Sequence, residues 1–348
     1  WLASAIDSIR ARYPHHVTVG AGDLIGASQL ASSLFLDEPA IGVLNRIGLD
    51  VAAVGNHEFD HGRAELLRKQ RGGCDKHATR DPCQLEKFAG ARFRYLAAST
   101  IDENGRTLFP ATELRHFGKG RQRVSIGFVG LTLKGTPELV SPDGIRGLRF
   151  ADEAETINAA IPRLRARGAD AVVVLIHEGI YTSGKPDPDT CNGVSGGLLP
   201  ILEKLDAGVD VVVSGHTHWP YVCNWRSADG ARSLLLTSAG VYGQLVTDIT
   251  LEIDPAANRV VAARADNVIV QSPGYDTSSR GPVQNTTLYP QFAPRPDIAA
   301  YVRRYADAAI SFTARPVGKL AAAAPRREGG GLQGSSPLGN LIADAQVA

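Results

Sequence analysis

The chain has 348 residues, of which 43% are hydrophobic and 21% are charged, and its formal net charge is +1. This is the composition of a globular protein long enough for one large domain or for two. The near-neutral charge gives no support for nucleic acid or an anionic membrane as the main partner. No apolar run approaches the roughly 20 residues that a membrane-spanning helix needs.

The two ends of the sequence indicate a segment of a longer protein. The chain contains no Met and starts at Trp1, directly before an apolar pattern typical of an amphipathic helix. It stops inside a second predicted helix, which runs from Leu338 to Ala348. We therefore expect that a signal peptide, if the protein has one, lies outside this sequence.

Strands and helices alternate over the N-terminal part of the chain. The predicted helices are Leu2–Tyr13, Gln29–Phe35, Ile41–Ile47, Ala154–Arg167 and Leu198–Leu205. The predicted strands are Val17–Val19, Val51–Val54, Arg94–Ala98, Val124–Leu131, Ala171–Ile176 and Val209–Val213. This alternation is typical of a sheet with helices on both faces.

The pattern changes after Val213. Ser233–Ser238 and Leu245–Ile253 are predicted strands with no helix between them, and Val260–Val270 extends this β-rich part. A second sheet packed on the first is therefore expected. The predicted fold class is α/β, arranged as a four-layer α/β/β/α sandwich.

The C-terminal part contains one long predicted helix between irregular segments. Residues 271–296 show no periodicity and are expected to form a long surface loop, and Pro296–Ala314 is the helix. Residues 321–334 are rich in Ala, Arg and Gly, as linkers often are. We predict one domain over residues 1–314, followed over residues 315–348 by a linker and the beginning of another domain.

None of the four cysteines lies in a Cys-x-x-Cys zinc pattern. Cys74 and Cys83 bracket a polar loop, Cys191 lies in a loop rich in Pro, Gly and Asp, and Cys223 lies shortly after His218. Because secreted proteins place disulfides in such loops, we favour the bridges Cys74–Cys83 and Cys191–Cys223 and an exported protein. The alternative is four free thiols in a cytosolic enzyme, which a thiol titration would reveal.

Polar side chains follow four predicted strands at the point where each strand ends. They are Asp23, Asn56, His57, His177, His216 and His218. Each has an ordinary explanation when taken alone, such as a helix cap for Asp23 or a core histidine for His177. Ligands of open α/β sheets, however, bind outside the carboxyl ends of the strands. We therefore expect these side chains to share one site.

The residue types in this set suit divalent metals. His216 and His218 are one residue apart and would point to the same side of an extended segment. Imidazole nitrogen together with carboxylate and amide oxygen binds borderline and hard divalent ions. The carboxylate of Asp23 could bridge two ions, while the neutral amide of Asn56 leaves positive charge for an anionic substrate. Two ions about 3.5–4 Å apart are the usual clamp for phosphoryl transfer.

These segments resemble the motifs of the calcineurin-like metallophosphoesterases. The matching residues are Gly22-Asp23, Gly55-Asn56-His57-Glu58, His177 and Gly215-His216-Thr217-His218. The longer runs resemble the 5′-nucleotidase family more narrowly, and they are Gly22–Ser28, Gly55–Gly62 and Ser336–Asp344. The resemblance covers nearly the whole chain.

The resemblance implies a role for each matching residue. The metal ligands that it implies are Asp23, Asn56, His177, His216 and His218. Among them, Asp23 would bridge two metals, and His218 would belong to the second metal site while the other three complete the first. His57 would be the catalytic histidine that meets the phosphate, with Asp60 as its orienting partner. The ions could be Zn²⁺, Mn²⁺, Co²⁺ or Fe.

The sequence departs from the family pattern at its N-terminus. The family begins with an Asp-x-His on its first strand, which supplies two ligands to the second metal, and no Asp-x-His precedes Asp23. We therefore expect this segment alone to be weakly active or inactive, and to have open backbone edges. The parent protein would be the two-metal enzyme. Residues 315–348 would contain the linker and the beginning of its C-terminal nucleotide-binding domain.

The function that the resemblance implies is metal-dependent hydrolysis of nucleotide phosphomonoesters, as by a 5′-nucleotidase. The alternative within the family is a 2′,3′-cyclic nucleotide 2′-phosphodiesterase/3′-nucleotidase. A non-catalytic binding protein on the same fold is less favoured, because every expected ligand within the covered range is present. The expected partner is a nucleotide rather than a nucleic acid polymer, with no membrane span, and the expected location is periplasmic or extracellular. The oligomeric state stays open.

Overall fold

The computed structural model describes residues 1–184, 189–277, 281–316, 318–326 and 336–347. The chain divides into two compact units, Trp1–Ala306 and Asp307–Ala348. The larger unit contains all the residues of the predicted site. The division into functional domains over residues 1–314 and 315–348 stays a prediction.

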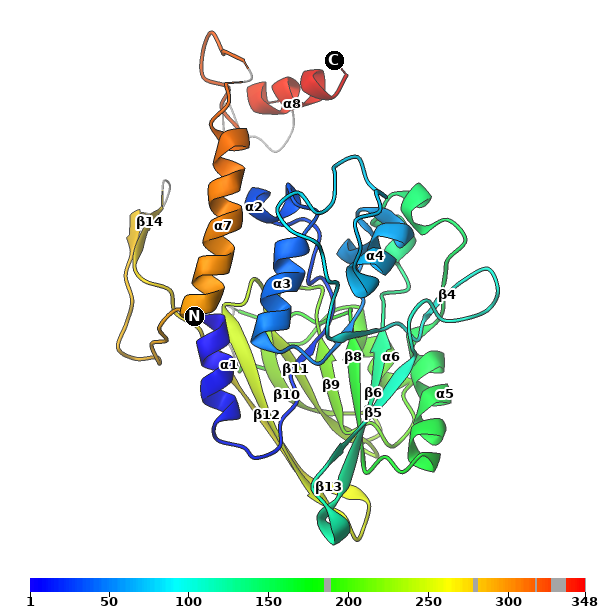
Figure 1. Cartoon of the computed structure of the whole chain (residues 1–348). Coiled ribbons are helices and arrows are strands. Elements are labelled where there is room, and N and C mark those ends of the chain that lie inside the picture. The colour runs from blue at the N-terminus through cyan, green and yellow to red at the C-terminus, as the bar shows by residue number, and fades with distance from the viewer. Residues whose placement is uncertain (185–188, 278–280, 317, 327–335, 348) are drawn as a thin grey trace. The chain divides into compact units, whose positions relative to one another are not determined.

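The larger unit contains a six-stranded sheet with the strand order β10-β11-β9-β8-β6-β5 (Figure 1). Its strands are β5 (Thr112–Phe117), β6 (Val124–Leu131), β8 (Ala171–Ile176), β9 (Val211–Ser214), β10 (Pro220–Arg226) and β11 (Ser233–Ala239). The four inner strands are parallel, and the two edge strands are antiparallel to their neighbours. β8 is buried along its whole length, as expected for an apolar strand in a parallel sheet covered on both faces.

Within the described residues, the other strands form one parallel sheet and three antiparallel pairs. The parallel sheet has the order β1-β2-β3 and consists of β1 (Val19–Gly20), β2 (Val51–Ala53) and β3 (Arg94–Leu96). The longest pair is β12 (Leu245–Asp254) with β13 (Arg259–Ile269). The two short pairs are β4 (Thr100–Ile101) with β7 (Arg149–Phe150), and β14 (Tyr275–Thr277) with β15 (Gly281–Val283).

Helices fill most of the connections between the strands. The α-helices described between residues 1 and 314 are α1 (Leu2–Arg10), α2 (Leu30–Ser33), α3 (Glu38–Ile47), α4 (Gly62–Arg71), α5 (Glu153–Ala166), α6 (Leu198–Glu203) and α7 (Pro296–Thr313). The 3₁₀ turns are η1 (His57–Phe59), η2 (Gly120–Gln122), η3 (Thr136–Glu138) and η4 (Pro142–Ile145). Local sequence sets the ends: Asp152 caps α5 by accepting a hydrogen bond from the Glu155 N–H, and Gly48 ends α3 at a φ of 80°.

Alternating side chains on β2 and β8 define the layers. On β2, Ala52 belongs to a buried cluster with α3 and α4, whereas Val51 and Ala53 face the six-stranded sheet. On β8, Val173 packs in that same inter-sheet cluster, and Val174 packs against α5 and α6. Helices thus cover the outer faces of two stacked sheets (Figure 1). The predicted α/β/β/α sandwich is confirmed.

Some predicted elements differ from those observed. Most are present with their ends shifted by a few residues, but residues 271–296 are not the unbroken loop that we predicted, because they contain β14 and β15. Strands of three residues are too short to show a period of two. The edge strands β5 and β10 were absent from the prediction, since β5 is partly exposed throughout and β10 begins with a proline and carries polar residues on one face.

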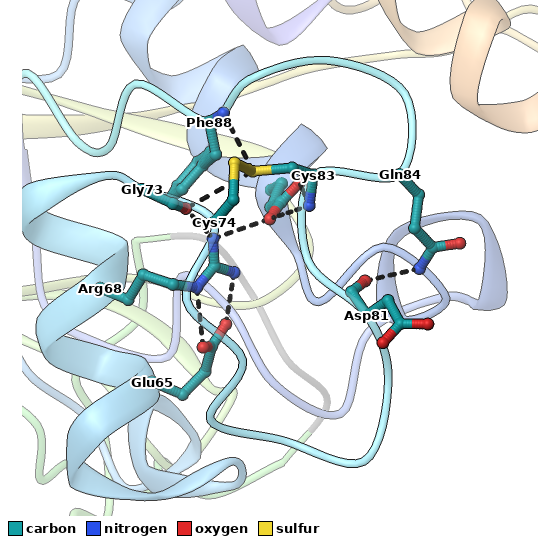
Figure 2. Close-up of a disulfide and its surroundings, with 9 residues drawn as sticks. Glu65, Arg68, Gly73, Cys74, Asp81, Cys83, Gln84 and Phe88 are labelled. Carbon is teal, nitrogen blue, oxygen red and sulfur yellow. Dashed lines mark hydrogen bonds and ion pairs between the residues drawn. A yellow bond between two sulfur atoms is a disulfide. The ribbon is translucent and has the colours of Figure 1, made fainter.

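The four cysteines pair as favoured from the sequence. Cys74–Cys83 has a Cα–Cα distance of 5.5 Å, and Cys191–Cys223 has one of 5.2 Å. The alternative of four free thiols is therefore wrong for this structure. The first bridge lies beside the guanidinium of Arg68, as Figure 2 shows.

The smaller unit contains α8 (Pro337–Val347), where the sequence predicted a helix from Leu338. Ser336 caps this helix, since its hydroxyl accepts a hydrogen bond from the Gly339 N–H at 3.0 Å. The final predicted residue, Ala348, lies outside the described residues. Among the helices that the structure describes, none has the length and apolarity to cross a membrane.

Candidate metal centre

Four parallel strands bring the predicted ligands to one edge of the fold. Asp23 follows β1, Asn56 follows β2, His177 follows β8, and His216 follows β9. The connections pack closely there: a Cβ on Gly22, whose φ is +89°, would lie 2.6 Å from the Gly55 nitrogen and 2.7 Å from Nδ1 of His177. A side chain at position 22 would therefore push the β1 and β2 connections apart.

The ligand atoms of Asp23, His177 and His216 all lie within 4.8 Å of one another. Nε2 of His177 lies 3.0 Å from Oδ2 of Asp23 and 3.1 Å from Oδ1 of Asn56. The rings of His177 and His216 have their centroids 5.1 Å apart. The structure thus brings together four of the five predicted metal ligands.

The hydrogen bonds of His177 fit a bound cation. Its Nδ1 lies 2.7 Å from the Ala21 carbonyl oxygen, which can only accept, so this nitrogen carries the proton. A neutral ring would then aim the Nε2 lone pair at the oxygens of Asp23 and Asn56. A cation between these three atoms removes the repulsion. Metal-binding histidines commonly donate their other N–H to a backbone carbonyl in this way.

The titratable groups of the cluster shift one another's pKa. Burial opposes ionisation of Asp23, but the hydrogen bond and charge of His177 outweigh it and lower the pKa of that carboxyl. Burial likewise opposes a charge on His177, and Asp23 reverses this and raises the pKa of the imidazole. Burial and the neighbouring His177 lower the pKa of His216. One carboxylate with two imidazoles and an amide leaves a divalent ion with net positive charge, which suits an anionic substrate.

The predicted catalytic pair lies directly beside this cluster. The His57 backbone N–H donates to Oδ1 of Asp23 at 2.9 Å. Nδ1 of His57 lies 2.9 Å from Oδ2 of Asp60, which also accepts a hydrogen bond from the Ala27 N–H at 3.1 Å. The carboxylate therefore holds the His57 ring by one nitrogen and leaves Nε2 for another partner. Both side chains are partly exposed, at 37% and 29%.

Glu58 is a structural anchor within the same turn. Its side chain is buried and accepts hydrogen bonds from the backbone N–H groups of Asp23, Leu24 and Gly55 at 2.6–2.9 Å. Burial, together with the nearby Asp23 carboxylate, raises the pKa of Glu58 to about 7. The Tyr95 hydroxyl reaches Oε1 at 3.4 Å. Glu58 thereby ties the connection after β1 to the connection after β2.

The backbone of the His216–His218 segment differs from the extended form that we expected. His216 and His218 have φ angles of 69° and 59°, in the left-handed region, and the Thr217 N–H donates to the Gly215 carbonyl at 2.8 Å. In the described part of the chain, His218 is not in the three-residue ligand cluster, and its ring lies 6.0 Å from that of Tyr242. Its role at a second metal stays a prediction.

Sequence reasoning missed Asp37, which hydrogen-bonds the loop beside the catalytic pair. The residue precedes Glu38-Pro39 at the start of α3, and a sequence pattern of this kind indicates a helix cap. In the structure its carboxylate makes no cap hydrogen bond. The sequence pattern thus indicates an acidic residue at the start of α3, but the hydrogen bonds of that residue go to the loop and not to the helix.

Comparisons with known proteins agree with this geometry. A family model described as calcineurin-like phosphoesterase matches residues 2–220. Endonuclease YhcR of Bacillus subtilis (strain 168) is 30% identical over 352 residues, which cover 100% of this chain and 25% of the relative. A 2′,3′-cyclic-nucleotide 2′-phosphodiesterase/3′-nucleotidase of Salmonella typhimurium is 25% identical over 345 residues, which cover 92% of this chain and 47% of the relative.

The fold is also shared with a solved structure. NAD nucleotidase (NadN) of Haemophilus influenzae superposes with a TM-score of 0.67 at 16% identity, covering 93% of this chain and 56% of that protein. The chain thus spans a quarter of the first curated relative and about half of the other two proteins. Since the family model matches more than half of its residues, the chain belongs to the calcineurin-like phosphoesterase family.

Proposed function

We propose that the full-length protein hydrolyses nucleotide phosphomonoesters in a metal-dependent reaction, in the manner of a 5′-nucleotidase. One observation carries this proposal: the metal-ligand cluster and the His57–Asp60 pair share Asp23, whose two carboxylate oxygens contact His177 and the His57 backbone. A cation at the cluster would therefore lie beside a histidine that is already held by a carboxylate.

The cluster would hold divalent metal, with Asp23 as the bridging ligand of a dinuclear centre. Asp23, Asn56, His177 and His216 would hold the first ion, and His218 would take part in the second. When bound, such ions neutralise phosphate charge and make a water a better nucleophile. Zn²⁺, Mn²⁺, Co²⁺ and Fe are all compatible with these ligands.

His57 would act on the leaving group. Asp60 holds Nδ1, and the His57 side chain is 37% exposed, so Nε2 would be left for the substrate. His57 would thus donate a proton to the departing ribose oxygen, or stabilise the charge that develops on the phosphate. Asp60 keeps the ring in the orientation that this requires.

A second substrate class is favoured by one relative. The 2′,3′-cyclic-nucleotide 2′-phosphodiesterase/3′-nucleotidase aligns with 92% of this chain. The ligand cluster does not separate the two substrate classes, because both reactions need the same ions around phosphorus. The name of the first relative adds a third substrate, a polynucleotide, although the chain covers 25% of that protein.

The two disulfides favour a periplasmic or extracellular location for the protein. Nucleotides would be the substrates there. Measurement of the protein in the culture medium, periplasm and cytoplasm of its source would test this location.

The decisive assay compares substrates on the natural full-length protein. We expect phosphate release from AMP in the presence of Mn²⁺, Zn²⁺ or Co²⁺, loss of activity with a chelator, and recovery when metal is returned. Hydrolysis of 3′-AMP, 2′,3′-cyclic AMP and a single-stranded oligonucleotide measures the alternatives. Activity that is unchanged in both Asp23→Asn and His57→Ala would overturn the proposal.

A further inference from the structure

We propose that Asp37 is a positioning residue for the His57–Asp60 pair and acts through the loop Gly26–Ser28. The inference rests on the proposed function, since it assigns a further residue to the same reaction. Asp37 lies outside the family motifs named above, and the residue is 1% exposed.

The carboxylate of Asp37 gathers donors from the loop and from α2. It accepts a hydrogen bond from the Gly26 N–H at 3.0 Å and from the Ser28 hydroxyl, both of which belong to the loop. The Ser32 hydroxyl of α2 donates to it at 2.6 Å. Both carboxylate oxygens are used, so the loop is anchored at two successive points around Ala27.

The same loop contacts the catalytic pair. The Ala27 N–H donates to Oδ2 of Asp60 at 3.1 Å, and this oxygen is the one closest to Nδ1 of His57. A Cβ on Gly26 would lie 2.7 Å from that oxygen and 2.8 Å from Cβ of His57. The loop therefore has no room to shift toward the pair, and the hydrogen bond from Ala27 fixes Asp60 only while the loop stays in place.

The backbone around Asp37 is held in an uncommon conformation. Leu36 and Asp37 have φ angles of 51° and 55°, and Ala27 has one of 43°. Non-glycine residues rarely occupy this region, and such outliers persist where surrounding contacts impose them. Leu36 is fully buried, so its conformation is fixed by packing. The consequence of this turn is that Asp37 points into the loop and does not cap α3.

The next residue fixes the turn from the other side. Glu38 accepts hydrogen bonds from the Arg68 guanidinium at 2.8 Å and from the Cys83 N–H at 3.0 Å. Both residues belong to the region around the Cys74–Cys83 bridge in Figure 2. The contacts of Glu38 with Arg68 and Cys83 thus hold the turn in place, and Asp37 in this turn holds the loop that contacts Asp60.

Two serine variants test this path with a matched design. Ser28→Ala and Ser32→Ala each remove one hydroxyl from the same carboxylate oxygen, but only Ser28 lies in the loop. We expect kcat for AMP hydrolysis to fall several-fold in Ser28→Ala and less in Ser32→Ala, with KM and bound metal unchanged. Asp37→Asn should lower kcat about ten-fold or more, because small displacements of catalytic groups are costly. An equal loss in both serine variants would overturn the proposal.

A double-mutant cycle separates positioning from simple destabilisation. If Asp37 acts through Asp60, Asp37→Asn should lower kcat by less than about two-fold when Asp60→Asn is already present. If the loss of kcat in the double variant equals the product of the losses in Asp37→Asn and Asp60→Asn, the two residues act independently and the proposal is contradicted. The serine pair keeps the test valid if Asp37→Asn does not fold.

An activity-independent measurement separates failure of this inference from failure of the proposed function. Amide hydrogen exchange at Gly26 and Ala27 should be faster in Ser28→Ala than in Ser32→Ala. If the natural protein hydrolyses none of the substrates, the proposed function fails, while the exchange data still report the anchoring of the loop. Equal exchange in the two variants would overturn the role of Asp37 directly.

Discussion

Nε2 of His177 lies 3.0 Å from Oδ2 of Asp23, although the two residues follow strands of different sheets. His177 follows β8 of the six-stranded sheet, and Asp23 follows β1 of the three-stranded sheet. An ion held by both residues would therefore link the two inner layers of the sandwich.

The first prediction is that metal removal lowers the stability of the fold. A ligand that binds only the folded state at 100 times its dissociation constant contributes about 2.7 kcal/mol. Calorimetry of the natural full-length protein should show a lower Tm after chelation and recovery with Mn²⁺ or Zn²⁺. In Asp23→Asn the metal should no longer raise Tm. A metal-dependent rise of the same size in that variant would contradict the site.

The second prediction concerns the separation of catalysis from metal binding. His57→Asn should lower kcat by about 10²- to 10⁴-fold, the usual contribution of a general acid or base. Its backbone N–H, which holds Asp23, is retained, so the metal content measured by emission spectroscopy should not change. His61→Asn, four residues further on, is the matched control and should keep its kcat. Loss of metal in His57→Asn would instead make His57 a ligand.

The sequence allowed prediction of most of the cluster because its physical signals are local. An apolar run indicates a buried parallel strand. The polar residue that follows the run then lies at the carboxyl edge of the sheet, independently of contacts made elsewhere in the chain. Asn56 and His177 are brought together in this way. The predicted pairing Cys191–Cys223 also depended on local loop composition.

Features that depend on tertiary contacts could not be predicted in this way. The left-handed φ of His216 is imposed by a bend after β9, whereas spacing alone implied extended backbone. Asp37 accepts hydrogen bonds from a loop that lies about ten residues earlier in the chain. That loop belongs to the motif Gly22–Ser28, and nothing in the motif indicates that Asp37 holds it. The strand β5 has polar and apolar residues on both faces, so its pairing with β6 at the sheet edge defines it rather than a clear alternation.

The third prediction is that Glu58 stabilises the fold through backbone hydrogen bonds. The carboxylate of Glu58 accepts hydrogen bonds from three backbone N–H groups. In Glu58→Gln the amide N–H₂ must face at least one of these N–H groups, which then loses its acceptor. A lost buried hydrogen bond that leaves its partner unsatisfied costs about 1–3 kcal/mol. Urea unfolding measures this cost. Tyr95→Phe removes only the hydroxyl contact at 3.4 Å and should cost less than Glu58→Gln; the opposite order would contradict the assigned role.

The fourth prediction concerns the ion-pair network of α4, part of which Figure 2 shows. Glu65, Arg68 and Lys69 are 1%, 4% and 1% exposed. Arg68 donates to Glu65 at 2.6 and 2.8 Å, and Lys69 also pairs with it. Removing one partner from a buried ion pair typically costs about 3–5 kcal/mol. Glu65→Gln should therefore be strongly destabilised at pH 7.

The pH dependence of this effect has a definite sign. Burial opposes ionisation of Glu65, but Arg68 and Lys69 outweigh it and lower the pKa of the carboxyl below its usual value. The unfolded chain then binds the proton first as the pH falls. The stabilisation is complete above the unfolded pKa of about 4.3 and is lost as the pH falls through the folded pKa.

Urea unfolding between pH 7 and pH 3 measures this dependence. The gap in unfolding free energy between the natural protein and Glu65→Gln should narrow at the acid end, because the natural protein also loses the charge there. Glu103→Gln is the matched control, since Glu103 pairs with Arg63 at 2.7 Å but its side chain is 56% exposed. An exposed pair contributes little to stability, because water and salt screen it. A gap for Glu65→Gln that is constant over this range would show that the lost stability comes from packing rather than from the charge of the carboxylate.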